Sequence, residues 1–152
     1  MRFLVLSLLI AAATVAQAQA PPESACTYQV CALRVEPGFF GIRIVQGEEG
    51  DVVSAAGLFS GVDLAEAVAG SPAAMEHAER YYASRRRSGL AYGGAVVLAL
   101  LGSYAETEGQ TGLAMVGYAA GFAATIYGTS QLASAQRERD RAIWDYNAQF
   151  AD

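Results

Sequence analysis

Lysine is absent from this chain of 152 residues, and charge of either sign is scarce. Charged residues make up 16% of the sequence, against about 25% in soluble domains, and 53% of the residues are hydrophobic. These proportions favour a membrane protein or a heavily buried chain. The net charge of −5 offers no basic face, so we expect no nucleic acid partner.

Residues with catalytic or metal-binding chemistry are scarce as well. His77 is the only histidine, and the residue four positions later is Tyr81, so the paired-histidine spacing of a helical zinc site fails. We therefore expect His77 to lie on a solvated helix face. Residues 57–61, Gly-Leu-Phe-Ser-Gly, place serine one position too late for a nucleophile elbow. We predict no enzyme, no catalytic residue, no cofactor and no metal.

The N-terminus has the pattern of an export signal. Arg2 precedes an apolar core over residues 3–16, and Ala16-Gln17-Ala18 is a small-x-small cleavage site. We predict a signal peptide over residues 1–18. Cys26 lacks the preceding apolar residue of a lipid-modified cysteine, so we predict no lipid anchor.

Two charge-free segments, residues 88–105 and 109–136, dominate the second half of the chain. Arg85, Arg86 and Arg87 precede the first segment, and an acidic turn at Glu106 separates the two. A membrane span needs about 20 apolar residues, so the pattern predicts apolar spans at 88–105 and 112–133. A buried helical hairpin in a soluble oligomer is the alternative for segments of this length.

Small residues recur four positions apart in both segments, which places them on one face of each helix. Such faces let two helix backbones approach closely. We predict helix packing at Gly89, Gly93, Gly117, Gly121, Ala124 and Gly128. Over residues 88–136 the pattern resembles the glycine-zipper class of exported two-helix bacterial membrane proteins. That resemblance implies a membrane-associated homo-oligomer.

The chain before these segments predicts a small β-unit over residues 26–56. We expect two strands, at 27–35 and 39–46, or three with 52–56, and turns at 36–38 and 47–51. We interpret Glu48, Glu49 and Asp51 as an acidic hairpin turn, although their oxygens also suit a cation. Such a sheet is marginal alone, so it must pack on the helices.

A Gly-rich connector, residues 57–71, with a short helical piece at 63–68, leads to the helices. Ser71 and Pro72 form an N-cap and a first helical residue. We expect helices from Pro72 to Tyr104 and from Gly112 to Phe150, paired antiparallel. The predicted fold is thus α+β: a β-meander followed by a helical hairpin over 72–150 with two transmembrane helices.

Aromatic residues fall into two groups along the hairpin. The first group, beyond the apolar zone, is expected to pack on the β-unit and comprises Trp144, Tyr146 and Phe150. The second group has the position of a membrane-interface belt and comprises Tyr92, Tyr104, Tyr118 and Tyr127.

Cys26 and Cys31 leave two alternatives open. If residues 26–31 form one extended strand, the two Cα atoms lie about 16 Å apart, too far for a disulfide. A bridge instead requires Cys26 to fold back outside the strand. The extended preference of residues 27–30 favours unbridged cysteines.

The orientation signals conflict. Arginine at both outer flanks predicts that the ends of the hairpin lie in the cytoplasm, whereas the export signal places them outside. Three alternatives would each resolve the conflict. The weakly apolar spans could insert late, the hairpin could be soluble, or residues 3–16 could lack a signal function.

We expect an exported, membrane-associated protein of the cell envelope with a structural or scaffolding role. The β-unit would be held to the membrane by an oligomerising hairpin in contact with lipid. A subunit of an oligomeric pore or transport assembly is the alternative. Few polar residues lie in the spans, Ser103 and Thr125 among them, which favours the scaffold.

Overall fold

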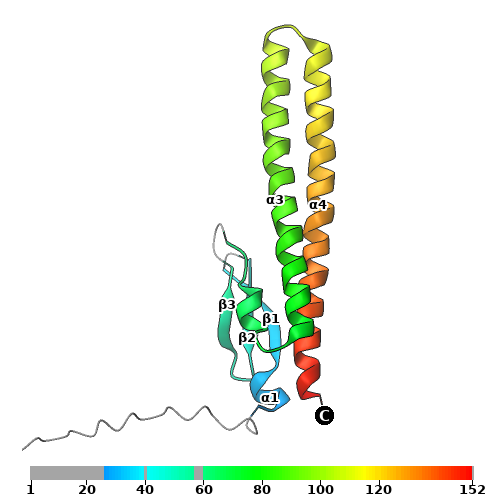
Figure 1. Ribbon diagram of the computed structural model, residues 1–152. Helices are drawn as coiled ribbons and strands as arrows, with labels where there is room; N and C mark the ends of the chain where they lie inside the picture. The colour runs from blue at the N-terminus through cyan, green and yellow to red at the C-terminus, as the bar shows by residue number, and fades with distance from the viewer. Residues whose placement is uncertain (1–25, 40, 57–59, 152) are drawn as a thin grey trace, which may run out of the picture.

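The computed structural model describes residues 26–39, 41–56 and 60–151, and the predicted signal peptide lies outside them. A small β-unit flanks the lower part of a long two-helix hairpin (Figure 1). The elements in chain order are α1 (Tyr28–Cys31), β1 (Leu33–Gly38), β2 (Gly41–Gln46), β3 (Asp51–Ala55), α2 (Leu64–Ala67), α3 (Pro72–Thr107), α4 (Thr111–Asn147) and the 3₁₀ helix η2 (Ala148–Phe150). The predicted α+β fold with an N-terminal meander is confirmed.

The hairpin follows from local signals at the helix ends. The Ser71 side chain accepts a hydrogen bond from the Ala74 amide, and Pro72 occupies the first turn. At the tip, Gly109 has φ +74°, a left-handed conformation that ends α3 and reverses the chain. The two helices then run antiparallel and side by side along their whole length (Figure 1).

The three strands form an antiparallel sheet in the order β1-β2-β3. Gly38 pairs with Gly41, so residues 36–38 belong to β1 and the predicted turn at 36–38 is wrong. Pro37 is tolerated there because β1 is an edge strand, where a missing amide donor costs little. A register shift between Ile44 and Val45 buries both side chains.

The first helix, α1, replaces the N-terminal part of the predicted strand 27–35. One helical turn rises about 1.5 Å per residue instead of about 3.3 Å, so it shortens the path between the cysteines. The Cα atoms of Cys26 and Cys31 lie 5.6 Å apart and their sulfurs form a disulfide. The preference for unbridged cysteines is therefore wrong.

The base of the molecule, where the sheet meets the hairpin, contains the hydrophobic core. Ile44 of the sheet and Leu64 of α2 are fully buried in one cluster with Ala78 and Ala142 of the two long helices. The Asn147 amide also pins β1 to the end of α4: its oxygen accepts from the Leu33 amide at 2.7 Å and its nitrogen donates to the Leu33 carbonyl at 2.8 Å. The sheet thus depends on the helices for its core.

Candidate functional site

The seam between α3 and α4 is built from residues that recur every seven positions, as in a coiled coil. In α3 the buried series is Ala74, Tyr81, Ser88, Ala95 and Gly102, and in α4 it is Ala114, Gly121, Gly128, Ala135 and Ala142. A second series, three positions later, is buried or half-buried and includes Ala105 and Gly117. Beyond Tyr81 the first series therefore consists of small residues.

Three of the six predicted packing residues occupy tight positions in this seam. A Cβ on Gly117 would lie 2.8 Å from the Gly102 Cα, and one on Gly121 would lie 3.1 Å from the Ala95 carbonyl oxygen. A Cβ on Gly128 would meet the Tyr92 ring at 3.2 Å. Backbone contacts of this kind exclude any side chain larger than hydrogen at Gly117.

The other three predicted packing residues lie differently. Gly89 and Gly93 are exposed, and an added Cβ on either would have nothing within 4 Å. Ala124 is half-buried and belongs to the second seven-residue series of the seam. Gly102 was not among the predicted residues, although its Cβ position is closed by the Ala114 oxygen at 3.1 Å. The seven-residue recurrence is the sequence signal that identifies it.

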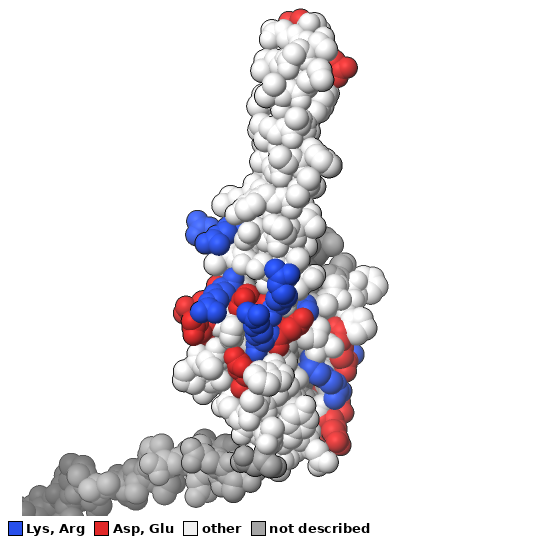
Figure 2. Space-filling model, turned by 90° about the vertical axis from the view of Figure 1, so that its right-hand side faces the viewer, with Lys and Arg blue, Asp and Glu red and all other residues white. Residues whose placement is uncertain are grey.

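Because the seam takes the small residues, the large apolar side chains of the upper hairpin point outward. On α3, Leu90, Val96 and Leu100 are 60% or more exposed, and on α4 Met115 and Phe122 are 68% and 69% exposed. Figure 2 shows a long uncharged shaft between the charged base and the acidic tip. We call this part, residues 88–105 and 111–130, the shaft.

Two apolar grooves run along the shaft, where small residues leave space between the larger side chains of the two helices. A groove of about 330 Å³ near the tip lies between Leu101 of α3 and Leu113 of α4, with Gly102 and Gly117 in its lining. A second, of about 400 Å³, has Val96 and Phe122 in its lining. Neither groove offers a cluster of polar groups for catalysis.

By length and composition, α3 is the one helix in the described part of the chain that is apolar enough to cross a membrane. The second predicted span, 112–133, lies in α4, which does not meet the same measure. The glycines and hydroxyl residues of α4 lower its mean hydropathy.

The four tyrosines predicted to form a belt divide into two pairs. Tyr92 and Tyr118 pack over the seam glycines, and their hydroxyls bond the Thr129 hydroxyl at 3.0 Å and the Glu106 carboxylate at 2.9 Å. Tyr104 and Tyr127 are 66% and 50% exposed. In the antiparallel pairing Tyr104 lies towards the tip and Tyr127 towards the base.

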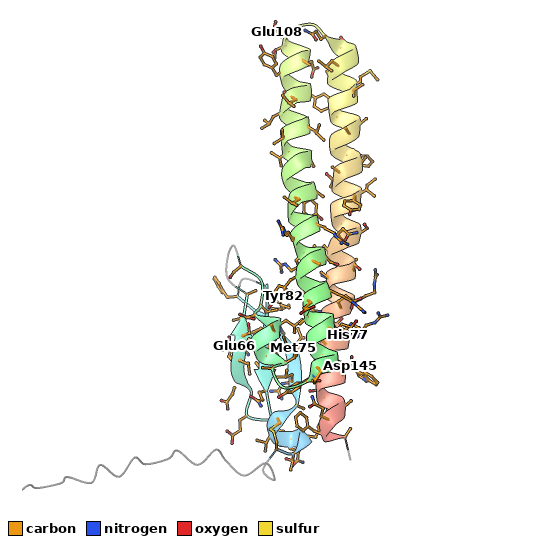
Figure 3. The ribbon with its side chains drawn as sticks, viewed as in Figure 1. Glu66, Met75, His77, Tyr82, Glu108 and Asp145 are labelled. Carbon is orange, nitrogen blue, oxygen red and sulfur yellow. A yellow bond between two sulfur atoms is a disulfide. The ribbon has the colours of Figure 1, made fainter. Side chains whose placement is uncertain are left out.

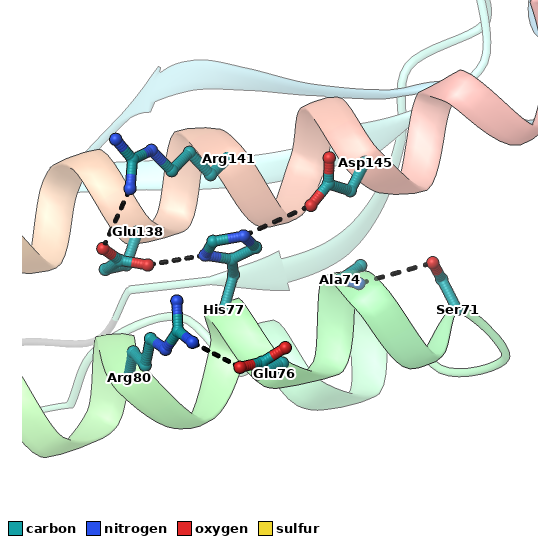
Figure 4. Close-up of polar contacts among 8 residues, drawn as sticks. All are labelled: Ser71, Ala74, Glu76, His77, Arg80, Glu138, Arg141 and Asp145. Carbon is teal, nitrogen blue, oxygen red and sulfur yellow. Dashed lines mark hydrogen bonds and ion pairs between the residues drawn. The ribbon is translucent and has the colours of Figure 1, made fainter.

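A polar cluster occupies the seam near the base, where His77 of α3 faces two carboxylates of α4 (Figures 3 and 4). His77 Nδ1 lies 2.6 Å from Glu138 Oε2, and Nε2 lies 3.3 Å from Asp145 Oδ2. The three side chains are only 14–23% exposed. His77 thus packs between the helices, and the prediction of a solvated helix face is wrong.

The hydrogen bond from His77 is the main reason that the pKa of Glu138 lies below its ordinary value of 4.5. Arg141 adds to this at 3.5 Å from the other carboxylate oxygen. His77 thus has a carboxylate oxygen of α4 near each of its ring nitrogens. The cluster lies on the second seven-residue series, since Glu138 and Asp145 follow Gly117 at multiples of seven.

The remaining candidates carry no site chemistry. Within the described residues no group of three or more His, Cys, Asp or Glu side chains is placed to hold a metal ion. The acidic residues Glu48 and Glu49 lie in the turn between β2 and β3. Of the aromatic residues expected on the β-unit, Tyr146 packs against the core, whereas Trp144 is 71% exposed and that expectation is wrong for it.

The glycines allow a matched pair of substitutions. We predict that Gly117→Ala destabilises the hairpin by about 1–3 kcal/mol, because the added carbon meets the Gly102 backbone. Gly94→Ala, with open space around it, should stabilise the helix by about 0.5–1 kcal/mol. Unfolding of micelle-bound protein followed by circular dichroism measures both. Equal effects of the two substitutions would contradict the seam assignment.

A second prediction concerns the polar cluster. Glu138→Gln should lower the free energy of unfolding by about 1–3 kcal/mol at neutral pH, since it removes a charge-assisted hydrogen bond. Because the pKa of Glu138 is depressed in the folded state, its contribution is complete above pH 4.5 and is lost as the pH falls through the lower folded value. The gap between parent and variant should therefore close in acid.

The control is Glu76→Gln, next to His77 in α3, which removes the exposed ion pair between Glu76 and Arg80. We expect it to change the free energy of unfolding by less than about 0.5 kcal/mol. A pH-independent gap for Glu138→Gln, or an equal loss in the control, would count against the role of the cluster.

Comparison with family models, with curated proteins and with solved structures finds no match to this chain.

Proposed function

We propose that this protein is an exported scaffold of the cell envelope whose shaft lies in a lipid bilayer. The observation that carries the proposal is the distribution of side chains in the shaft. Small residues fill the seam, while residues such as Leu100 and Phe122 project outward without cover. In water such a hairpin gains little from burial and leaves its most apolar surface hydrated. In lipid the same surface is solvated and the close backbone contact supplies the association.

The dimensions of the shaft fit a bilayer. In α3 the uncharged stretch from Ser88 to Ala105 rises about 27 Å at 1.5 Å per residue, close to the hydrocarbon thickness of about 30 Å. The exposed tyrosines Tyr127 and Tyr104 lie towards its two ends, the position at which tyrosine is enriched in membrane proteins. These features support spans at 88–105 in α3 and 112–133 in α4. Helix α4 is the less apolar of the two and would cross the bilayer packed against α3.

The β-unit supplies the part of the scaffold outside the bilayer. It packs on the base through the shared core and through the Asn147 bonds to β1, so the sheet is attached to the hairpin. The disulfide between Cys26 and Cys31 suits an oxidising compartment, in keeping with the predicted export signal. We therefore assign the base to the non-cytoplasmic side of the membrane.

We assign the exposed face of Gly89 and Gly93 to contact with a second copy of the chain. The hairpin does not use these glycines, and the spacing of four residues lets a neighbouring helix approach closely. The protein would then form homo-oligomers in the membrane, as the resemblance to glycine-zipper proteins implies.

Bilayer insertion predicts the sign of a charge substitution. Val96→Arg places arginine in the middle of the shaft at a side chain that is 60% exposed. It should cost about 2.5–3.5 kcal/mol of insertion free energy and reduce the membrane fraction that survives an alkaline carbonate wash. Ala83→Arg, at an exposed position of the base, is the control and should leave that fraction unchanged. A parent protein recovered in the soluble fraction without detergent would overturn the proposal.

The homo-oligomer has its own test. Gly93→Leu should shift the oligomer distribution in mild detergent towards monomer, because the larger side chain keeps a second helix away. Ala123→Leu, the same enlargement at an exposed small residue of α4, serves as the control. An unchanged distribution in Gly93→Leu would exclude this face as the contact.

A further inference from the structure

The arginines of the described residues divide into two classes by their partners. Five form ion pairs with carboxylates, and these are Arg34, Arg43, Arg80, Arg139 and Arg141. Four have no carboxylate partner, and these are Arg85, Arg86, Arg87 and Arg137. Arg85 instead donates to the Tyr81 hydroxyl at 3.3 Å and lies over its ring. The protein has a net charge of −5, so carboxylates outnumber arginines. A shortage of carboxylates therefore does not explain why four arginines have no such partner.

Three of the unpaired arginines share one level of the molecule. Arg85, Arg86 and Arg87 are consecutive in α3 and exposed, and the uncharged shaft starts at the next residue. Consecutive helical residues are 100° apart, so the three side chains fan over about 200° of the helix circumference. We call them the arginine collar. Arg137 of α4 lies about 7 Å nearer the base in the antiparallel register.

The two ends of the shaft therefore carry opposite charge. The collar marks the base end, whereas the tip carries Glu106 and Glu108 and no basic residue (Figures 2 and 3). Gly61 of the connector packs against the Arg85 guanidinium, since an added Cβ there would meet it at 2.8 Å. The β-unit thus reaches as far as the collar, and above the collar the hairpin stands alone (Figure 1).

We infer that the arginine collar binds the phosphate groups of anionic phospholipids in the leaflet that faces the base. This inference rests on the proposed function, because it requires the shaft to lie in the hydrocarbon. A guanidinium offers paired donors that match two phosphate oxygens, and its long stem lets the charge reach the headgroup layer. The contact fixes the depth of the shaft in the bilayer.

The experiment uses a single reporter tryptophan just above the collar. Trp144, the one tryptophan of the chain, is exchanged by Trp144→Phe, and Leu90→Trp places the reporter one turn after the collar at a side chain that is 69% exposed. The full mature chain is reconstituted in phosphatidylcholine vesicles. One set of vesicles contains phosphatidylglycerol with brominated acyl chains, and the other set contains phosphatidylcholine with brominated acyl chains. Bromine quenches tryptophan only at contact, so competition between the two lipids gives their relative affinity at the collar.

We expect the anionic lipid to bind at least about fivefold more tightly than the zwitterionic lipid, the factor that one arginine near the surface supplies. Arg86→Gln with Arg87→Gln should bring the ratio close to one. The matched control, Arg34→Gln with Arg43→Gln, removes the same charge from the β-unit and should keep the parent ratio. Equal affinities in the parent, or equal losses in both double variants, would overturn the collar. Absence of quenching by either lipid would instead overturn insertion of the shaft, so the two failures are distinct.

Discussion

Close contact between the two long helices determines where every other apolar side chain can go. Gly117 and Gly102 bring the backbones so near that no carbon fits between them. Leu98 is half-buried beside these glycines, and the other large apolar residues of the shaft line its outside. The apolar exterior, the grooves beside the seam and the proposed place in a bilayer all follow from that one packing constraint.

The same seam changes character towards the base. Where the β-unit and α2 cover the hairpin, the seven-residue series contains a large side chain, Tyr81, which packs in the hydrophobic core. In the same region His77 meets Glu138 and Asp145 across the seam, so a specific polar pairing replaces backbone contact. Polar layers of this type fix register between helices. The base thereby sets the alignment that the featureless glycine seam above it requires.

Local signals in the sequence predicted the hairpin well. The charge-free segments, the Ser71 cap and the acidic turn at Glu106 each depend on a few neighbouring residues, and the helices begin within one residue of the predicted starts. Features that depend on residues outside the local stretch were not predicted correctly. The partner of His77 lies 61 residues away, and the extended preference of residues 27–30 yields to a helical turn closed by the Cys26–Cys31 bond. Pro37 entered a strand because that strand is an edge, which only the sheet order reveals.

The depth of the shaft in a bilayer is the most direct test of this account. Spin labels attached to single cysteines at positions 83, 90, 97 and 101 of the vesicle-bound protein report collision with oxygen and with a water-soluble nickel complex. Oxygen dissolves in hydrocarbon and the nickel complex does not. The account predicts high oxygen and low nickel accessibility at 90, 97 and 101, with the reverse at 83. High nickel accessibility at all four positions would contradict it.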